Sequence, residues 1–383
     1  MTLLLLTAVL AAAPAAPAAA ADKALEPFAA PAQSFSANIN GDAAAQADAF
    51  IDWNAVLDRA FNGLNIPADF VEGFRKGYNK TSNSLANALV DTVKKGGGFR
   101  LLRLRKSAAG KPLALYRVTP DSGGVNYIEL ELERRANGTV RAVEVEPYLS
   151  GEPLSATARR LAIRAAAEAK MNFIDKLAGK EGEFIKHAPK FKLMTEHLQA
   201  GRFADVLAVY ETLPQSLKEE KTALLQRLTA AQSLDDGKYQ AAMADFQKYH
   251  PTDPSLDLVT IDHSFMAKKW DKVHSAIDRL DKRVEGDPYL AVISASTYMQ
   301  EDRFGDAKKV LDASLAKEPT LAAAWWARVE VAMKTADHAD TAKQLDGVIK
   351  NLNIKLDGVA SSPEYAAFRA SKPGKAWLKA NKY

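Results

Sequence analysis

Hydrophobic residues change their spacing along this chain, and each change indicates a different kind of element. Across residues 50–64 they recur every three or four positions, which is the period of an amphipathic helix. Pro67 ends that stretch, and the segments 70–78 and 84–93 repeat the pattern. The sequence therefore predicts a helical region that extends to about residue 94.

From Phe99 the apolar residues fall at every second position, which predicts strands. The strands are expected at 99–106, 112–119, 125–134 and 139–148. Asn137-Gly138, a strong hairpin signal, separates the last two. In the third strand, apolar residues such as Ile128 alternate with glutamates such as Glu129, so one face is apolar and the other charged. This favours an antiparallel four-stranded sheet with helices packed on one side.

A basic cluster lies on and beside the first two strands: Arg100, Arg103, Arg105, Lys106 and Lys111. We expect Arg103, Arg105 and Arg117 to oppose the glutamates of neighbouring strands. No aromatic-and-basic motif accompanies the cluster, so nucleic-acid binding is not predicted. Helices followed by a four-stranded meander resemble the cystatin-like and nuclear-transport-factor-like α+β folds, a likeness that implies no function.

In the second half of the chain, aromatic residues recur about every 34 positions. They are Phe203, Tyr239, Trp270 and Phe304. When the chain is aligned on them, a small or β-branched residue follows at Val206, Ala242, Val273 and Ala307. A larger residue follows at Tyr210, Phe246, Ile277 and Leu311, and an earlier position holds Met194, Ala230, Ile261 and Ala295. Prolines close the units at Pro254 and Pro319, and at Pro288 a few residues late.

This pattern resembles the tetratricopeptide repeat (TPR) family. The resemblance implies an all-α solenoid of four to five helical hairpins, whose last unit is degenerate and has His338 where an aromatic residue belongs. It further implies that the first helix of each unit lines a concave groove. The groove positions are Arg227, Leu258, Asp262, Phe265, Met266, Tyr289, Val292, Ser296, Met299, Trp326, Glu330 and Met333, with Leu234 beside them. Methionines and aromatic rings suit an adaptable groove for a peptide or helix. The same side chains could instead bury the C-terminal tail or the N-terminal domain.

The first 21 residues have the pattern of an export signal. An apolar stretch over 3–13 is too short to span a bilayer, and Ala19 and Ala21 provide a small-x-small cleavage site. An uncleaved anchor is the alternative. The chain contains no cysteine, which excludes disulfides, thiolate metal sites and cysteine nucleophiles. These features predict a periplasmic or secreted protein with no membrane span in its mature form.

No enzyme motif emerges from the sequence. The six histidines show no metal-binding spacing, although His263 and His274 lie on successive repeat helices. The sequence shows no nucleophile elbow, phosphate-binding loop or dinucleotide fingerprint. Asp91, Tyr116 and Tyr127 could line a pocket in the α+β domain, and a filled core is favoured over it. Neither a cofactor nor a metal is predicted.

These observations predict the following organisation: a signal peptide (1–21), a disordered linker (22–46), an α+β domain (47–153), a connector helix (154–183), TPR-like repeats (184–356) and a capping tail (357–383). The predicted function is non-catalytic binding of a protein or peptide. Two alternatives stay open. The α+β domain could bind a small ligand or catalyse a reaction, with the array as a recruiting arm. The protein could also be purely structural, with its groove filled by its own tail.

Overall fold

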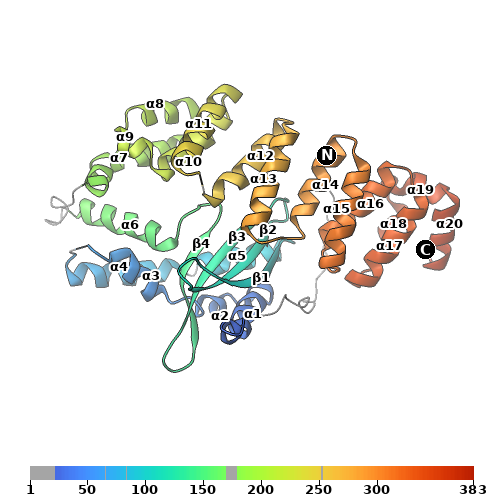
Figure 1. The fold of residues 1–383 in the computed structure, drawn as a ribbon, viewed down its shortest axis with the longest axis horizontal. Coiled ribbons are helices and arrows are strands. Elements are labelled where there is room, and N and C mark those ends of the chain that lie inside the picture. The colour runs from blue at the N-terminus through green and yellow to red at the C-terminus, as the bar shows by residue number, and fades with distance from the viewer. Residues whose placement is uncertain (1–21, 65, 83, 170–178, 252) are drawn as a thin grey trace.

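A computed structural model describes residues 22–383 except 65, 83, 170–178 and 252. It consists of an α+β domain followed by an all-α, TPR-like array (Figure 1). The predicted fold class is therefore confirmed. The predicted signal peptide lies outside the described residues.

Among its described residues, the α+β domain begins with five helices and continues with one antiparallel sheet. The helices are α1 (Glu26–Asn40), α2 (Ala44–Asp48), α3 (Trp53–Phe61), α4 (Ala68–Ser82) and α5 (Ser84–Lys94). The strands are β1 (Gly98–Lys106), β2 (Pro112–Thr119), β3 (Asn126–Arg134) and β4 (Val140–Pro147). They pair in chain order as a meander. The strand predictions are confirmed to within one residue at each end.

Helix α1 corrects the prediction of a disordered linker at 22–46. Its buried residues Phe28, Ala32, Phe35 and Ile39 face the apolar side of the sheet. Phe35 packs with Tyr116 at a ring-centroid distance of 5.3 Å. The Ala-, Pro- and Ser-rich composition suggested disorder, but the apolar residues are spaced by three and four positions, as a buried helix face requires. Thus α1 is part of the core of the domain.

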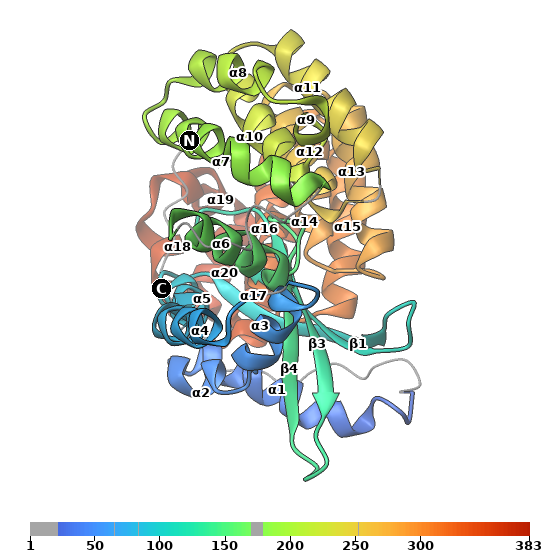
Figure 2. The ribbon, with the colours of Figure 1, turned by 90° about the vertical axis from the view of Figure 1, so that its left-hand side faces the viewer.

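The sheet is covered on both faces, whereas the sequence predicted helices on one side. Helices α1, α2 and α5 supply the core on the apolar face. On the other face, Leu115, Tyr127 and Tyr148 are buried in one cluster with residues of the repeat array. The two views place α1 and α2 on one side of the strands and the middle of the array on the other (Figure 1, Figure 2). The face of the sheet that carries the charged strand residues therefore lies partly at a domain interface.

In the part of the array that the structure describes, the helices form five hairpins in the predicted register. They are α7 (Gly179–Gln199) with α8 (Phe203–Glu211), α10 (Lys221–Gln232) with α11 (Asp236–Tyr249), α12 (Pro254–Met266) with α13 (Trp270–Arg283), α14 (Leu290–Gln300) with α15 (Phe304–Lys317), and α16 (Ala322–Lys334) with α17 (His338–Leu352). A short helix, α9 (Gln215–Lys218), joins the first two. We refer to these hairpins as units 1 to 5.

Burial confirms the repeat register. The second-helix positions Val206, Ala242, Val273 and Ala307 are all 0% exposed. The larger residues four positions later, and the small positions of the first helices, are also buried. Close approach of the paired helices therefore occurs where the aligned pattern places its small residues.

The connector and the tail flank the array. The connector was expected to be one helix from Ser155 to about Leu177. Helix α6 (Leu154–Glu168) forms its first part, residues 170–178 lie outside the described residues, and α7 begins at Gly179. The tail forms α18 (Asp357–Ser361), η2 (Pro363–Tyr365), α19 (Ala366–Ala370) and α20 (Lys372–Ala380). Trp377 of α20 is buried, and its indole Nε1 donates to Asp346 of α17 over 2.7 Å, so the tail packs on unit 5.

Candidate partner-binding surfaces

The predicted groove residues fall into three groups by their surroundings. The first group is covered by the α+β domain. Leu258 of α12 is buried in the cluster that contains Leu115 and Tyr127. Tyr289, just before α14, is buried and lies 5.4 Å below the guanidinium of Arg117 from β2. The sheet therefore occupies this part of the predicted groove.

The second group lies inside the array or against the tail. Trp326 and Met333 of α16 are half-buried against the cluster that includes Phe368 and Trp377. Met299 is buried in the core of unit 4. Arg227 of α10 is largely buried and forms an ion pair with Asp245 of its own hairpin. A partner cannot reach these side chains in full without moving what covers them.

The third group is open to solvent. Met266, at the end of α12, is 79% exposed, and Asp262 one turn earlier is exposed as well. Phe265 is half-buried, with its ring 5.5 Å from that of Trp270. On the next units Val292, Ser296 and Glu330 are partly exposed. Leu234, in the turn between α10 and α11 of unit 2, is 39% exposed. We call Leu234, Asp262, Phe265 and Met266 the open first-helix surface.

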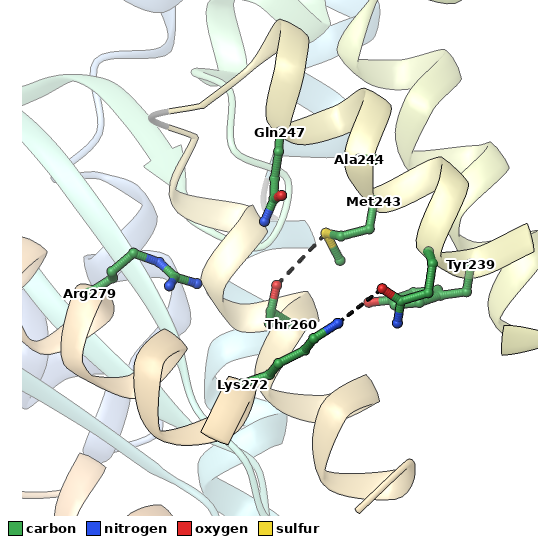
Figure 3. Close-up of a pocket in the computed structure, with 8 residues that line it drawn as sticks. Tyr239, Met243, Ala244, Gln247, Thr260, Lys272 and Arg279 are labelled. Carbon is green, nitrogen blue, oxygen red and sulfur yellow. Dashed lines mark hydrogen bonds between the residues drawn. The ribbon is translucent and has the colours of Figure 1, made fainter. Parts of the chain in front are cut away.

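A cleft lies on the second-helix side, where the sequence predicted no site. Its volume is about 230 Å³ (Figure 3). Residues of α11 from unit 2 and of α13 from unit 3 form its two sides, and Thr260 of α12 lies between them. The lining residues are Tyr239, Gln240, Met243, Ala244, Gln247, Thr260, Lys272 and Arg279. The Nζ of Lys272 donates to Oε1 of Gln240 over 3.0 Å, which links the two second helices.

Apolar packing is thin across the same junction. Units 1 and 2 share one hydrophobic cluster, which only Leu256 and Val259 of α12 enter from unit 3. The core of unit 3 belongs to the cluster that includes the sheet. The remaining contacts are mostly polar or aromatic. They include a stack of Tyr239 on His263, with ring centroids 3.3 Å apart, a contact of His263 with Asp236 and an ion pair of Lys269 with Asp236.

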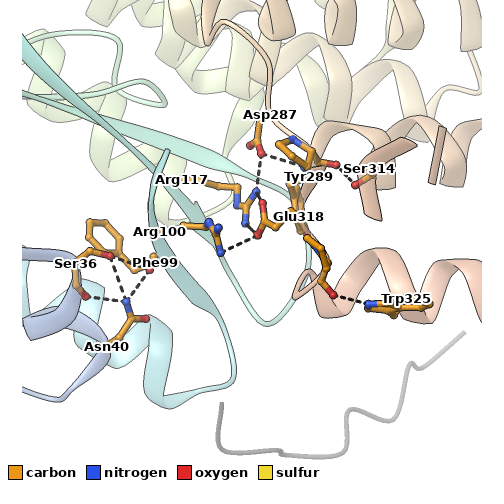
Figure 4. A network of polar contacts seen from close by, with 12 residues as sticks. Ser36, Asn40, Phe99, Arg100, Arg117, Asp287, Tyr289, Ser314, Glu318 and Trp325 are labelled. Atoms are coloured by element: carbon orange, nitrogen blue, oxygen red, sulfur yellow. Dashed lines mark hydrogen bonds and ion pairs between the residues drawn. The ribbon is translucent and has the colours of Figure 1, made fainter. Parts of the chain in front are cut away.

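A buried ionic network joins the sheet to units 3 to 5 (Figure 4). Arg117 is 5% exposed and forms ion pairs with Asp287 at 2.6 Å and with Glu318 at 2.8 Å. The hydroxyl of Tyr127 donates to the other oxygen of Asp287 over 2.8 Å. Arg100 reaches Glu318 at 3.3 Å. Asp287 and Glu318 lie in the two loops that follow second helices α13 and α15.

The strand arginines pair differently from the sequence expectation. Arg105 does face Glu129 of β3, at 2.6 Å, as expected. It also donates to the carbonyl oxygen of Arg283 at the end of α13 over 2.7 Å. Arg103 donates to the carbonyl oxygens of Glu285 and Gly286. Arg117 pairs with repeat residues in place of a strand glutamate. The basic cluster of the strands thus serves largely as a domain interface.

The residues considered for catalysis, apart from Asp91, are engaged in structural contacts. Tyr116 is fully buried and donates to the carbonyl oxygen of Ala32 over 3.0 Å. Asp91 is exposed on α5. His263 and His274 each contact a different carboxylate, Asp236 and Glu301. In the part of the chain that the structure describes, histidine and acidic side chains form no group suited to a metal ion.

Comparisons with known proteins give little further guidance. No protein-family model matches the chain, and no curated protein matches it. Among solved structures, the chain is similar to PilW, described as a widely conserved type IV pilus biogenesis factor. The match has a TM-score of 0.36 and 15% sequence identity, and it covers 54% of this chain and 95% of that chain. At this level of similarity we draw no conclusion from it. Among the described residues, no helix is both long and apolar enough to cross a membrane.

Proposed function

We propose that the protein is an exported, non-catalytic scaffold that holds a protein or peptide partner on the open first-helix surface of its repeat array. The observation that carries this proposal is the 79% exposure of Met266 beside half-buried Phe265. Methionine and aromatic side chains adapt to varied apolar partners, and stacked hairpins present such side chains along a concave face. The leader-like first 21 residues support a periplasmic or secreted location.

The position of the open first-helix surface narrows the mode of binding. The sheet covers Leu258 and Tyr289, and the tail packs near Trp326 and Met333. The freely available part therefore lies on units 2 and 3, where exposed Asp262 adds a negative charge to the apolar side chains. We expect a short amphipathic segment, apolar on one side and with a basic residue near Asp262, in place of a long peptide that spans all five units.

Site-specific photo-crosslinking tests this proposal. A benzophenone amino acid replaces Met266 in one variant and Lys309, an exposed residue of second helix α15, in the control. In envelope extract we expect a discrete protein adduct from position 266 that is absent from position 309. The adduct at a probe in place of Leu234 should weaken when Met266 is also changed to Ser. No adduct at 266, or the same adducts at 266 and 309, would contradict the proposal.

The alternative of a purely structural protein, whose groove is filled by its own tail, is supported only by the packing of the tail. Val359, Tyr365, Phe368 and Trp377 are buried against unit 5. A chain that ends at residue 356 exposes this cluster, so its thermal unfolding temperature should fall. If the shortened chain gains no partner adduct at position 266, the tail acts only as a cap. A new adduct that requires removal of the tail would show that the tail blocks a binding surface.

A further inference from the structure

The cleft between α11 and α13 contains a buried hydroxyl without a partner. Tyr239 is 2% exposed, and within the described part of the chain its hydroxyl has no hydrogen-bond partner. Figure 3 shows that the hydroxyl points from α11 toward the cleft. Burial raises the pKa of this hydroxyl, so it stays protonated at neutral pH and can donate. Buried polar groups nearly always have a partner, which makes this one a candidate ligand contact.

One cationic side chain of the cleft, Lys272, has no anionic partner among the described residues. Lys272 and Arg279 lie two turns apart on the same face of α13, and both side chains are exposed. Arg279 is neutralised by Asp257, whose Oδ1 is 2.7 Å from its Nε. Lys272 donates to the neutral amide oxygen of Gln240, and among the described residues no carboxylate lies within ion-pair distance of it. One cationic charge is therefore left without an anionic partner.

The remaining walls limit the size and character of a ligand. Met243, Ala244 and the methyl group of Thr260 provide apolar surface, and Gln247 provides a further amide. A volume of about 230 Å³ admits a group of roughly ten non-hydrogen atoms. A single uncompensated lysine matches one carboxylate group of a ligand better than a phosphate, which carries more charge and commonly binds to several donors at once.

We propose that this cleft binds a carboxylate group on a short aliphatic chain, with Tyr239 and Lys272 as its donors. The carboxylate could be the side chain of a glutamate in a peptide or a free small dicarboxylic acid. A ligand in this position would bridge α11 and α13 and so connect units 2 and 3. The proposal is independent of the function proposed above, because the cleft lies on the second-helix side and shares no residue with the open first-helix surface.

Methyl-labelled methionine gives a direct readout of binding. The chain has seven methionines, and Met243 lines the cleft, whereas Met266 lies on the open first-helix surface. The full chain, labelled at methionine methyl groups, is titrated with glutarate in one arm and with the peptide acetyl-Ala-Glu-Ala-amide in the other. We expect the Met243 resonance to move and saturate at millimolar concentrations, while the Met266 resonance stays in place.

Three variants make the assignment specific. Tyr239→Phe removes only the hydroxyl, and Lys272→Gln removes the charge. Each should raise the midpoint of the Met243 titration about tenfold, the effect of losing one hydrogen bond or ionic contact to a charged group. Lys309→Gln, on exposed α15, serves as the control and should leave the midpoint unchanged. Tyr239→Phe should melt at the same temperature as the parent or higher, because the hydroxyl has no partner to lose.

The outcomes separate the two sources of the carboxylate. A Met243 shift with the peptide alone indicates a protein side chain, a shift with glutarate alone indicates a free acid, and either supports the site. No Met243 shift with either probe up to about 20 mM would overturn the proposal. It would also be overturned if Tyr239→Phe and Lys272→Gln both bound like the parent.

Discussion

Two junctions in this molecule both involve the repeat array but differ in the contacts that hold them together. The first junction lies between the sheet and units 3 to 5. There Arg117 is buried and forms ion pairs with buried Asp287 and Glu318, and a hydrophobic cluster contains residues from both sides. At the junction between units 2 and 3, the contacts are mostly polar, and a cleft remains with the unpartnered hydroxyl of Tyr239.

This difference indicates which parts of the protein act as one body. The α+β domain belongs with units 3 to 5, although units 1 and 2 separate them in the sequence. A pair of buried charges must be complementary in geometry because each desolvated charge is costly without the other. Such a junction has little tolerance for movement. The junction of units 2 and 3 also contains an ion pair, between Lys221 and Asp253, but few apolar residues cross it and a cleft remains that could take up a ligand.

The largest effect is expected from breaking the buried network. Asp287→Ala leaves the guanidinium of Arg117 with one carboxylate fewer and removes the acceptor of Tyr127, so we expect a loss of about 3 kcal/mol in the free energy of unfolding. Urea denaturation of the full chain measures it. Glu285→Ala is the matched control, because its side chain is 54% exposed and its ion pairs with strand arginines should contribute about 1 kcal/mol or less. Equal losses from the two variants would show that the network does not hold this junction.

Overpacking distinguishes the tightly packed positions from the cleft. Ala307→Leu and Ala242→Leu each insert three carbons at a 0% exposed helix contact and should cost about 1–3 kcal/mol. Ala244→Leu, two residues from Ala242 but exposed at the cleft, should change stability by less than about 0.5 kcal/mol. Thermal and urea unfolding of the three variants provide the comparison. Unchanged stability at both buried positions would disprove the repeat register.

A smaller effect is expected from pH at the junction of units 2 and 3. Burial lowers the pKa of His263, which stacks on Tyr239, and Lys269 and Lys272 oppose its protonation, although Asp236 favours it. Since the unfolded chain binds a proton at this residue more readily, the contribution of His263 is present above about pH 6.5 and lost as the pH falls below it. The stability difference between the parent and His263→Gln should therefore shrink between pH 7.5 and pH 5.5. A difference that grows on acidification would contradict this sign.

Elements whose position depends on a local sequence pattern were predicted correctly. Alternation and the Asn137-Gly138 turn placed the strands, and the periodic small residues placed the helix contacts. Composition misled at α1, where the spacing of Phe28, Ala32 and Phe35 was the better signal. The partners of Arg117 could not be predicted, because Asp287 and Glu318 are distant in sequence and the strand glutamates offered equally plausible partners.

The candidate sites show the same limit. Met266 and Asp262 are exposed, and no sequence pattern indicated that the sheet covers Leu258 and Tyr289. Whether the exposed residues bind a partner stays a prediction. Tyr239 was identified from sequence as one of the recurring aromatic positions of the repeat, and its side chain is buried. That its hydroxyl lacks a partner depends on the spacing between two hairpins, which a repeat pattern does not encode.

The central claim is that the α+β domain and units 3 to 5 form one body to which units 1 and 2 are joined less firmly. The absence of cysteine allows paired spin labels at introduced cysteines without background. One label replaces Gln33 on α1, and the other replaces either Lys309 on α15 or Lys248 on α11, all exposed positions. Electron–electron double resonance should give a narrow distance distribution for 33–309 and a broader one for 33–248. Distributions of equal width would contradict the claim.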